Sequence, residues 1–305
     1  MATQEKEILQ ADDLAGLSHE QLLRFYRTML TSRKIDEREI SLRKQNKTFF
    51  QISGAGHEAI GVAIAEHCRP GSDWFFTHYR DRALVLSLGQ TPLDHLLAAV
   101  GSGDDPATGG RQMPCHFSDV RLNIASSSSV VATQFLQAVG AAEADTKISR
   151  IPGIRDLVHN FDEDEIVLVC SGEGQTSEGE FWESLNSACN LSLPIVFVIE
   201  DNEYAISVPV EVQTAGGSIS QLVSGFPNLY IVECDGTDIV DSYRAAGAAI
   251  THAREQRAPA FIHAHCTRPH SHSMSDDERA YRTEKELAAQ DLRDPLTRIS
   301  TLLVE

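Results

Sequence analysis

Two runs of consecutive apolar residues in the middle of the chain constrain its fold more than any other feature. Residues 166–170 (IVLVC) and 194–199 (PIVFVI) are continuous β-type runs, and residues 177–191 between them have apolar positions at helical spacing. Half-exposed strands alternate apolar and polar residues, whereas parallel strands buried on both faces are apolar throughout. The pattern therefore predicts buried parallel strands joined by a crossover helix.

The same order of segments continues toward the carboxyl terminus. Residues 230–232 form another β-type run, residues 238–256 have helical spacing, and residues 260–265 form the last run. This alternation predicts an α/β fold, in which an open, mostly parallel sheet is wound right-handedly with helices on both faces. Ligands of such sheets bind at the carboxyl ends of the strands. We therefore expect the chemically active residues directly after these runs.

The amino-terminal part of the chain is predicted to be helical. Residues 17–47 are rich in helix formers, with apolar residues at roughly helical spacing. A glycine-bearing turn at residues 53–56 (SGAG) leads into a second helix at residues 57–67. We accordingly divide the chain into an amino-terminal helical segment, residues 1–52, and an α/β domain, residues 53–305.

The charge balance restricts the ligands that the chain is expected to bind. The sequence has 44 acidic residues against 26 Lys and Arg, a formal net charge of −18. Such a surface repels phosphate backbones, so nucleic acid is not expected as a partner. An anionic cofactor would need a locally positive site or a metal ion.

Cysteine spacing and the amino terminus indicate the cellular compartment. The six cysteines form no CxxC pair and no zinc-site or disulfide pattern, which predicts free, buried thiols in a reducing compartment. The first residues (MATQEKEI) have neither the apolar core of a signal peptide nor the Arg-rich, acid-poor character of a transit peptide. No apolar stretch is long enough to span a membrane. We therefore expect a cytoplasmic protein with no membrane partner.

Two loops that follow the central runs carry oxygen donors. They are residues 171–179 (SGEGQTSEG) and residues 200–207 (EDNEYAIS), and as strand-end loops one helix apart they are expected to be neighbours. A carboxylate, an amide oxygen and free backbone carbonyls suit Mg²⁺ or Ca²⁺. Glycines allow close backbone approach, and a helix that begins near Ser177 presents N–H groups to an anion. The pair predicts a metal-assisted diphosphate site, although a lone Gly-acid-Gly sequence is more often a plain turn.

These two loops together resemble the thiamine-diphosphate motif, which opens with Gly-Asp-Gly or Gly-Glu-Gly and ends in Asn-Asn. Residues 173–207 resemble the alpha subunits of the pyruvate and branched-chain 2-oxo-acid dehydrogenases, and the resemblance extends over residues 24–298. It implies the thiamine-diphosphate-binding fold, with magnesium held by Glu173, Asn202 and the backbone carbonyl of Tyr204. The glutamate at 173 is more like the branched-chain group.

One residue departs from the family pattern in this motif. Asp201 stands where the family usually has asparagine. The extra carboxylate either binds the metal or faces away from it.

Two further segments match the family closely. Residues 75–82 (FFTHYRDR) read alone as a helix start with a surface Arg–Asp pair, but the resemblance implies that Tyr79 and Arg80 contact the cofactor, with Arg80 giving forked positive charge to the diphosphate. Residues 101–118, rich in Gly, Pro and Asp, are predicted to be a long ordered loop. This loop includes His116, which the resemblance places near the substrate end of the cofactor.

The serine run and the last strand-end loop complete the implied site. Residues 126–129 (SSSS) read alone as a linker before a helix at residues 133–145, and residues 270–277 (HSHSMSDD) follow the last strand. The resemblance implies that His272 lies over the cofactor and the reacting carbon. The implied cofactor-binding set is Tyr79, Arg80, Ser129, Val131, Gly172, Gly174, Gln175 and His272. In some members Ser128, Thr133 and Gln134 also coordinate potassium, although Val130 here replaces the usual proline. His57 is a signature position with two interpretations, a helix-start cap and a catalytic residue.

The resemblance implies a function and an assembly. The chain would be the alpha subunit of a component that oxidatively decarboxylates a branched-chain 2-oxo acid or pyruvate and transfers the acyl group to a lipoyl arm. His272 and His116 are the expected catalytic residues, as groups that titrate near neutral pH. A beta-type partner, separate or fused, would complete an α₂β₂ enzyme that works with a lipoyl-bearing acyltransferase. Two alternatives remain: an acetoin dehydrogenase alpha subunit, and a non-catalytic assembly subunit of the same fold.

Overall fold

A computed structural model describes residues 14–158 and 161–304 of the chain. The first residues of the chain, on which the expectation of neither a signal nor a transit peptide rests, lie outside the described residues. Within the described part, the strands are β1 (Trp74–Phe76), β2 (Val167–Gly172), β3 (Ile195–Asp201), β4 (Tyr204–Ala205), β5 (Val208–Pro209), β6 (Tyr230–Cys234) and β7 (Ala260–His265). The helices are α1 (His19–Lys44), α2 (Glu58–His67), α3 (Arg82–Leu88), α4 (Pro92–Ala99), α5 (Thr133–Arg150), α6 (Gly179–Leu191), α7 (Val210–Gln213), α8 (Ile219–Val223), α9 (Ile239–Gln256), α10 (Glu284–Asp291) and α11 (Pro295–Val304).

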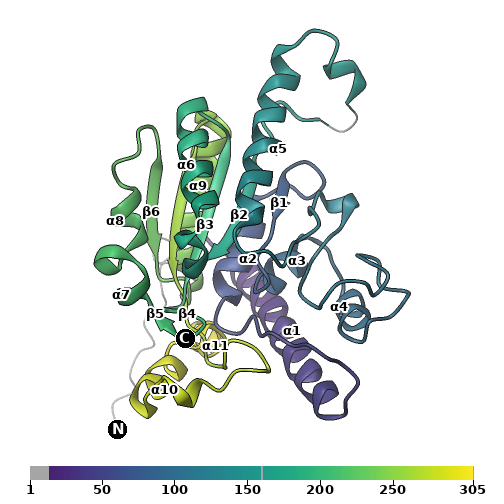
Figure 1. Cartoon of the computed structure of the whole chain (residues 1–305), viewed down its shortest axis with the longest axis vertical. Helices are drawn as coiled ribbons and strands as arrows, with labels where there is room; N and C mark the ends of the chain where they lie inside the picture. Colours follow the sequence, from purple (N-terminus) through teal and green to yellow (C-terminus); the bar gives the residue numbers. More distant parts are fainter. Residues whose placement is uncertain (1–13, 159–160, 305) are drawn as a thin grey trace.

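The central sheet is parallel throughout, with strand order β1-β2-β3-β7-β6 (Figure 1). The predicted runs form β2, β3, β6 and β7, and all residues of β2 and β3 are buried. The predicted α/β fold is therefore confirmed. A separate antiparallel hairpin, β4–β5, follows β3 directly.

Two apolar cores lie on opposite faces of this sheet. One joins α2, α3 and α9 to residues such as Leu168 and Val196, and the other joins α5, α6 and α8 to their strand neighbours such as Val167 and Phe197. Successive side chains of a strand point to opposite faces, so each buried strand supplies both cores. Helix α1 packs outside the first layer, against α2 and α11.

The predicted ordered loop is held by one aspartate. The Asp105 carboxylate accepts hydrogen bonds from the backbone N–H groups of Ala107, Thr108 and Gly110 and from the Thr108 hydroxyl. Helix α5, which follows the loop and the serine run, extends past the ends of the strands (Figure 1). In the described residues, no helix combines the length and the apolar composition that membrane crossing requires.

The segment around residues 75–82 differs from the helix start that its pattern alone suggests. Phe75 and Phe76 belong to the edge strand β1, and α3 begins only at Arg82. Arg80, Asp81 and Arg82 are almost fully buried, so the surface-pair interpretation is wrong. A strand of three residues is too short to show a periodicity, and the partners that allow burial of Arg82 come from α1, far away in the sequence.

The helix expected near Ser177 begins two residues later. A 3₁₀ turn, Glu173–Ser177, separates β2 from α6, and α6 starts at Gly179 after the extended residue Glu178. The predicted helix near Ser177 is therefore confirmed to within two residues, and that its N–H groups face an anion stays a prediction. The residues that directly follow β2 form the 3₁₀ turn and not the first turn of α6.

Candidate active site

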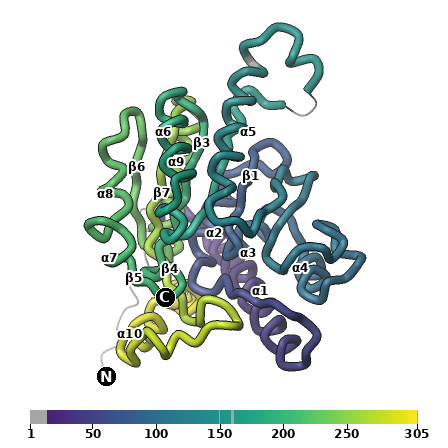
Figure 2. The backbone as a smooth tube through the Cα atoms, viewed as in Figure 1, coloured from purple at the N-terminus to yellow at the C-terminus, as the bar shows by residue number. Residues whose placement is uncertain are grey.

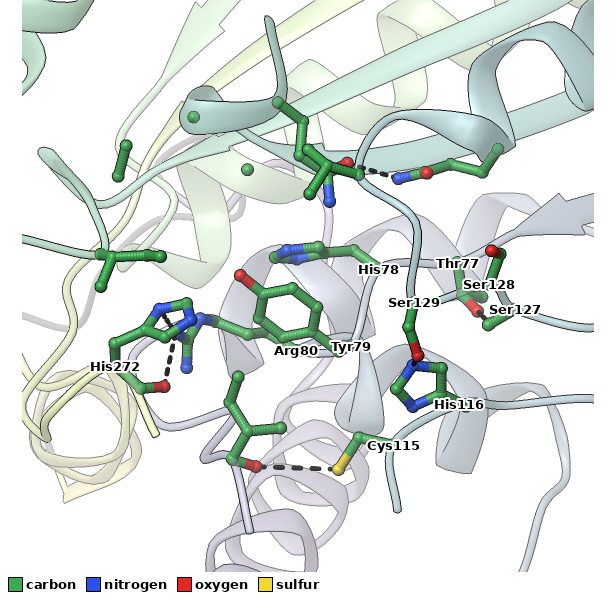
Figure 3. A pocket seen from close by; sticks show the side chains of 18 of the residues that line it. Thr77, His78, Tyr79, Arg80, Cys115, His116, Ser127, Ser128, Ser129 and His272 are labelled. Atoms are coloured by element: carbon green, nitrogen blue, oxygen red, sulfur yellow. Dashed lines mark hydrogen bonds between the residues drawn. The ribbon is translucent and has the colours of Figure 1, made fainter. Parts of the chain in front are cut away.

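A cavity of about 340 Å³ opens at the carboxyl ends of β1, β2 and β3. The loops that line it are the ones selected from the sequence, including the loop that follows β7 (Figure 3). The lining includes all twelve predicted site residues: Tyr79, Arg80, His116, Ser129, Val131, Gly172, Glu173, Gly174, Gln175, Asn202, Tyr204 and His272. Segments more than a hundred residues apart in the sequence therefore meet in one place.

The two loop tips that were expected to be neighbours are in contact. The backbone N–H of Asn202 donates to Oε2 of Glu173 at 3.4 Å, and the two residues are 4% and 1% exposed. Among the described residues, Oε1 of Glu173 and Oδ1 of Asn202 are buried without a hydrogen-bond partner. Burial, together with the nearby Asp201 carboxylate, raises the pKa of Glu173 to about 7. Two buried, unpartnered oxygens on residues that contact each other are a donor set that fits a hard divalent cation.

His57 fixes the orientation of this amide. Its Nε2 lies 3.3 Å from Nδ2 of Asn202, and because the amide nitrogen can only donate, Nε2 of His57 is the acceptor. The contact leaves Oδ1 of Asn202 free to face a ligand. His57 precedes α2 but its side chain makes no capping bond, so the structure disfavours the interpretation as a backbone cap.

Small residues let the two loops approach. A Cβ on Gly174 would lie 2.8 Å from Cβ of Ala205, closer than real side chains come. The backbone carbonyls of Glu173 and Gly174 accept from Nε2 of Gln213. The predicted third ligand, the Tyr204 carbonyl, lies 3.4 Å from a guanidinium nitrogen of Arg268.

Arg80 and His272 form a pair in the lining of the cavity (Figure 3). Nη2 of Arg80 donates to the carbonyl oxygen of His272 at 3.0 Å and to its Nδ1 at 3.2 Å, while Nη1 donates to the Ser53 carbonyl. A guanidinium only donates, so Nδ1 of His272 accepts and the ring proton is on Nε2. Arg80 thus gives the cavity positive charge, but its Nη1 and Nη2 already donate hydrogen bonds within the protein.

The pKa of His272 differs from the near-neutral value that was expected from the sequence. Burial and the adjacent Arg80 guanidinium lower the pKa of His272 to about 4. The ring is therefore neutral at neutral pH and presents a hydrogen-bond donor. Sequence alone placed its titration near neutral pH because the Arg80 contact joins residues that are far apart in the chain.

His116 carries its ring proton on the other nitrogen. Its Nδ1 lies 3.2 Å from the Pro114 carbonyl, which can only accept, so Nδ1 carries the proton. Its Nε2 accepts from the Ser129 hydroxyl at 2.6 Å. In Figure 3 Tyr79 lies between this pair and the Arg80–His272 pair.

The extra carboxylate of Asp201 does not line the cavity. Its Oδ2 lies 3.0 Å from Nε2 of His263, and its Oδ1 accepts from the backbone N–H of Glu203 at 2.8 Å. Of the two alternatives, the structure shows the one in which Asp201 faces away from the predicted magnesium ligands.

Sequence reasoning missed two charged or titratable residues at the site. His78 is buried and lines the cavity; its Nδ1 lies 3.4 Å from Oε2 of Glu200, and its Nε2 has no hydrogen-bond partner among the described residues. Arg268, three residues after the end of β7, donates to the carbonyl of Ile206 and to the Tyr281 hydroxyl. Both follow a strand end, which is the signal that could have identified them.

The mouth of the cavity exposes apolar side chains. Met113, Val131 and Ile206 line the cavity and are each about half exposed, and Val130 beside them is more exposed still. Exposed apolar side chains that gather at one place on a protein surface commonly mark an interaction site.

Comparisons with known proteins agree on one group. The dehydrogenase E1 component family matches residues 26–305. The chain is 35% identical over 290 residues to the 2-oxoisovalerate dehydrogenase subunit alpha of Bacillus subtilis, covering 95% of this chain and 84% of that protein. It is 31% identical to the 3-methyl-2-oxobutanoate dehydrogenase subunit alpha of Mycobacterium tuberculosis, over 94% and 71% of the two chains. It is 30% identical to the mitochondrial 2-oxoisovalerate dehydrogenase subunit alpha of Dictyostelium discoideum, of which it spans only 64%.

Proposed function

The chain belongs to the dehydrogenase E1 component family, as its motifs predict, and from this premise we propose that it is the alpha subunit of a thiamine-diphosphate-dependent branched-chain 2-oxo-acid dehydrogenase. The observation that carries the proposal is the meeting of Glu173 and Asn202, with their orphaned oxygens, in one cavity with Arg80 and His272. The reaction is the oxidative decarboxylation of a 2-oxo acid with transfer of the acyl group to a lipoyl arm.

The residues present fit the proposed cofactor and its metal. Glu173, Asn202 and the Tyr204 carbonyl would hold magnesium, and Gly172 and Gly174 line the cavity in which a diphosphate would bind. Arg80 supplies positive charge in a chain whose net charge is −18. When bound, thiamine diphosphate supplies the electron sink that decarboxylation needs.

The two histidines have complementary protonation states for this chemistry. His272 carries its proton on Nε2 and is held by Arg80, so it can donate a hydrogen bond to an oxygen of the substrate. His116 carries its proton on Nδ1, so Nε2, which now accepts from Ser129, can take up a proton. We assign His272 as the donor and His116 as the acceptor.

The substrate proposal rests on the relatives and on the lining of the cavity. The relatives are named for 2-oxoisovalerate and 3-methyl-2-oxobutanoate. Phe50, Ile52, Met113, Val131 and Ile206 give the cavity apolar walls. Apolar walls favour a branched aliphatic side chain over the methyl group of pyruvate by about 1–3 kcal/mol for each extra methylene group.

The exposed apolar mouth supports a beta-type partner that closes the cavity, separate or fused, in an α₂β₂ assembly. The lipoyl arm of an acyltransferase would then reach the acyl group along the boundary between the two subunits. A potassium ion at Ser128, Thr133 and Gln134 stays a prediction. Nε2 of Gln134 donates to Gln175 and to the Cys170 carbonyl, so Oε1 of Gln134 would be the atom that binds the ion.

Substrate profiling of the assembled enzyme tests the proposal. The chain is produced with a beta-type partner and assayed with thiamine diphosphate, magnesium and three substrates: 3-methyl-2-oxobutanoate, pyruvate and acetoin. We expect the highest kcat/KM for 3-methyl-2-oxobutanoate. A preference for acetoin would make the chain an acetoin dehydrogenase subunit. No turnover, combined with no magnesium-dependent cofactor binding, would support a non-catalytic assembly subunit.

Replacing His272 by alanine is expected to spare cofactor binding and to lower kcat by about 100-fold or more, because a positioned proton donor contributes roughly that much. The measurements are the cofactor Kd by calorimetry and kcat for the best substrate. The exposed neighbour His270, changed to alanine, is the matched control. An unchanged kcat in His272→Ala would remove His272 from the proposed mechanism.

A further inference from the structure

A second group of ligand-type side chains lies at the carboxyl ends of three neighbouring strands, outside the cavity. Strands β3, β7 and β6 lie side by side (Figure 2). Asp201 is the last residue of β3, His265 is the last of β7 with His263 two positions before it, and Glu233 is the last but one of β6. In the sheet register Asp201 pairs with His265, and Glu233 pairs with His263. Residues two apart on a strand share a face, so all four side chains project from the same face of the sheet.

We propose that Asp201, His263 and His265 bind a divalent transition-metal ion such as zinc, at a site distinct from the proposed magnesium site. One potential ligand atom from each of the three residues lies within 4.8 Å of the others. The inference concerns a different set of atoms from the proposed function and does not depend on it.

The hydrogen bonds around His263 leave two acceptors facing each other. The Ser220 hydroxyl donates to the Glu233 carboxylate, so its oxygen accepts from Nδ1 of His263 at 3.1 Å. With the proton on Nδ1, Nε2 of His263 presents a lone pair to Oδ2 of Asp201, only 3.0 Å away. Such a contact is favourable only when a cation lies between the two atoms, and that cation is either an additional proton or a metal ion.

His265 supplies the argument for a metal ion. Its Nε2 lies 3.2 Å from Oε2 of Glu233, which can only accept, so Nε2 is protonated and Nδ1 keeps its lone pair. Glu233 therefore orients both rings, directly at His265 and through Ser220 at His263. A carboxylate that holds one ring nitrogen of a histidine and leaves the other for an ion is a usual outer shell of a metal site.

The remaining geometry is compatible with zinc. Two zinc ligands at tetrahedral angles lie about 3.3 Å apart, so the 3.0 Å between His263 and Asp201 needs an opening of a few tenths of an ångström. The ligand atom of His265, which lies within 4.8 Å of both, has to come to the same spacing. The second oxygen of Asp201 is held by the Glu203 backbone N–H, as expected of a ligating carboxylate. His263 is fully buried, whereas the side chain of His265 is 44% exposed and gives an ion a path from solvent.

The donor set also separates this site from the proposed magnesium site. Two imidazole nitrogens favour zinc and its transition-metal neighbours, whereas Mg²⁺ prefers oxygen ligands such as those of Glu173 and Asn202. An ion on Asp201 would join the ends of β3 and β7 and would fix the turn that carries Asn202. Its expected role is therefore structural.

Zinc titration of the full-length chain tests the proposal. Chain freed of metal by a chelator is titrated with ZnCl₂ by calorimetry, with excess magnesium present, and Co²⁺ is used as a spectroscopic probe of nitrogen ligation. We expect about one Zn²⁺ per chain, with binding weakened by at least about 100-fold in His265→Gln, because even outer-shell changes cost 10–100-fold. Since zinc binds only the folded chain at this site, it should also raise Tm in the native protein and not in His265→Gln. The matched control, the exposed His19→Gln, should behave as the native chain does.

Three outcomes would overturn the proposal. Equal zinc affinity in the native chain and in His265→Gln would mean that His265 is not a ligand. No binding to the native chain would mean that the cation between His263 and Asp201 is a proton. Zinc binding that is lost in Glu173→Gln but kept in His265→Gln would place the ion at the proposed magnesium site. Failure of magnesium-dependent cofactor binding alone would count against the proposed function and would leave the zinc result standing.

Discussion

Replacing Glu173 by glutamine is expected to abolish magnesium-dependent binding of thiamine diphosphate and to leave the fold intact. Glutamine keeps the shape of the side chain but removes the charge of a ligand that is buried with one unpaired oxygen. Loss of a metal ligand should weaken the magnesium-dependent cofactor affinity by at least about 100-fold, more than an outer-shell change costs. Calorimetry of cofactor binding with and without magnesium measures the effect. The exposed Glu211→Gln is the matched control.

The pH dependence of the native chain gives the same prediction a second measurement. Metal binding needs the ionised carboxylate, and the pKa of Glu173 is raised to about 7 by burial. Magnesium-dependent affinity should therefore fall by about tenfold for each pH unit below 7. For stability the sign is opposite: the folded chain holds this proton more tightly than the unfolded chain, so the metal-free protein loses stability as pH rises toward 7. Cofactor affinity that is flat from pH 8 to pH 5.5 would contradict the assignment.

Replacing Arg82 by methionine is expected to lower the free energy of unfolding by roughly 3–5 kcal/mol, the usual effect of removing one partner from a buried ion pair. Arg82 donates to Asp36 and to both oxygens of Glu39, and all three side chains are only 1% exposed. Without the guanidinium, two carboxylates remain buried and unpaired. Burial already raises the pKa of Glu39 to about 7 against the opposing effect of Arg82.

The same substitution should also affect the active site. Arg82 donates to Sγ of Cys115 at 3.0 Å, and Cys115 has a left-handed backbone conformation, with φ of 64°, immediately before His116. We therefore expect kcat to fall together with stability, because the loop that holds His116 loses its anchor.

Urea unfolding with unchanged m values measures the stability part. Arg279→Met is the matched control, since its pair with Asp277 has side chains that are 79% and 57% exposed and should contribute less than about 1 kcal/mol. Adding Asp36→Asn and Glu39→Gln to Arg82→Met should restore part of the stability, because no charge is then left unpaired. A loss in Arg82→Met no larger than in Arg279→Met would be the contrary result.

The features that sequence predicted well are those that depend on local patterns. Strands β2 and β3 are apolar at every position in their centres, and a strand end identifies the next residues as candidates for chemistry. Glu173 and Asn202 could therefore be assigned to one site from the sequence alone, because parallel strands one helix apart bring the loops that follow them together.

The features that sequence missed depend on pairs that are distant along the chain. Arg82 reads as a surface residue until Asp36 and Glu39 on α1 are placed beside it. His272 reads as a group that titrates near neutral pH until Arg80 is placed against its ring. The direction of the Asp201 carboxylate depends likewise on His263, sixty-two positions later.

The half-exposed apolar mouth of the cavity has a consequence for the isolated chain. The net charge of −18 keeps copies of the chain apart at low ionic strength. Dissolved salt at 0.15 M shortens the range of that repulsion to about 8 Å. Long-range electrostatic repulsion then no longer prevents the burial of Met113, Val131 and Ile206 against another copy. Salt should therefore drive self-association of the chain when it is produced alone, and a partner that covers the mouth should keep it dispersed.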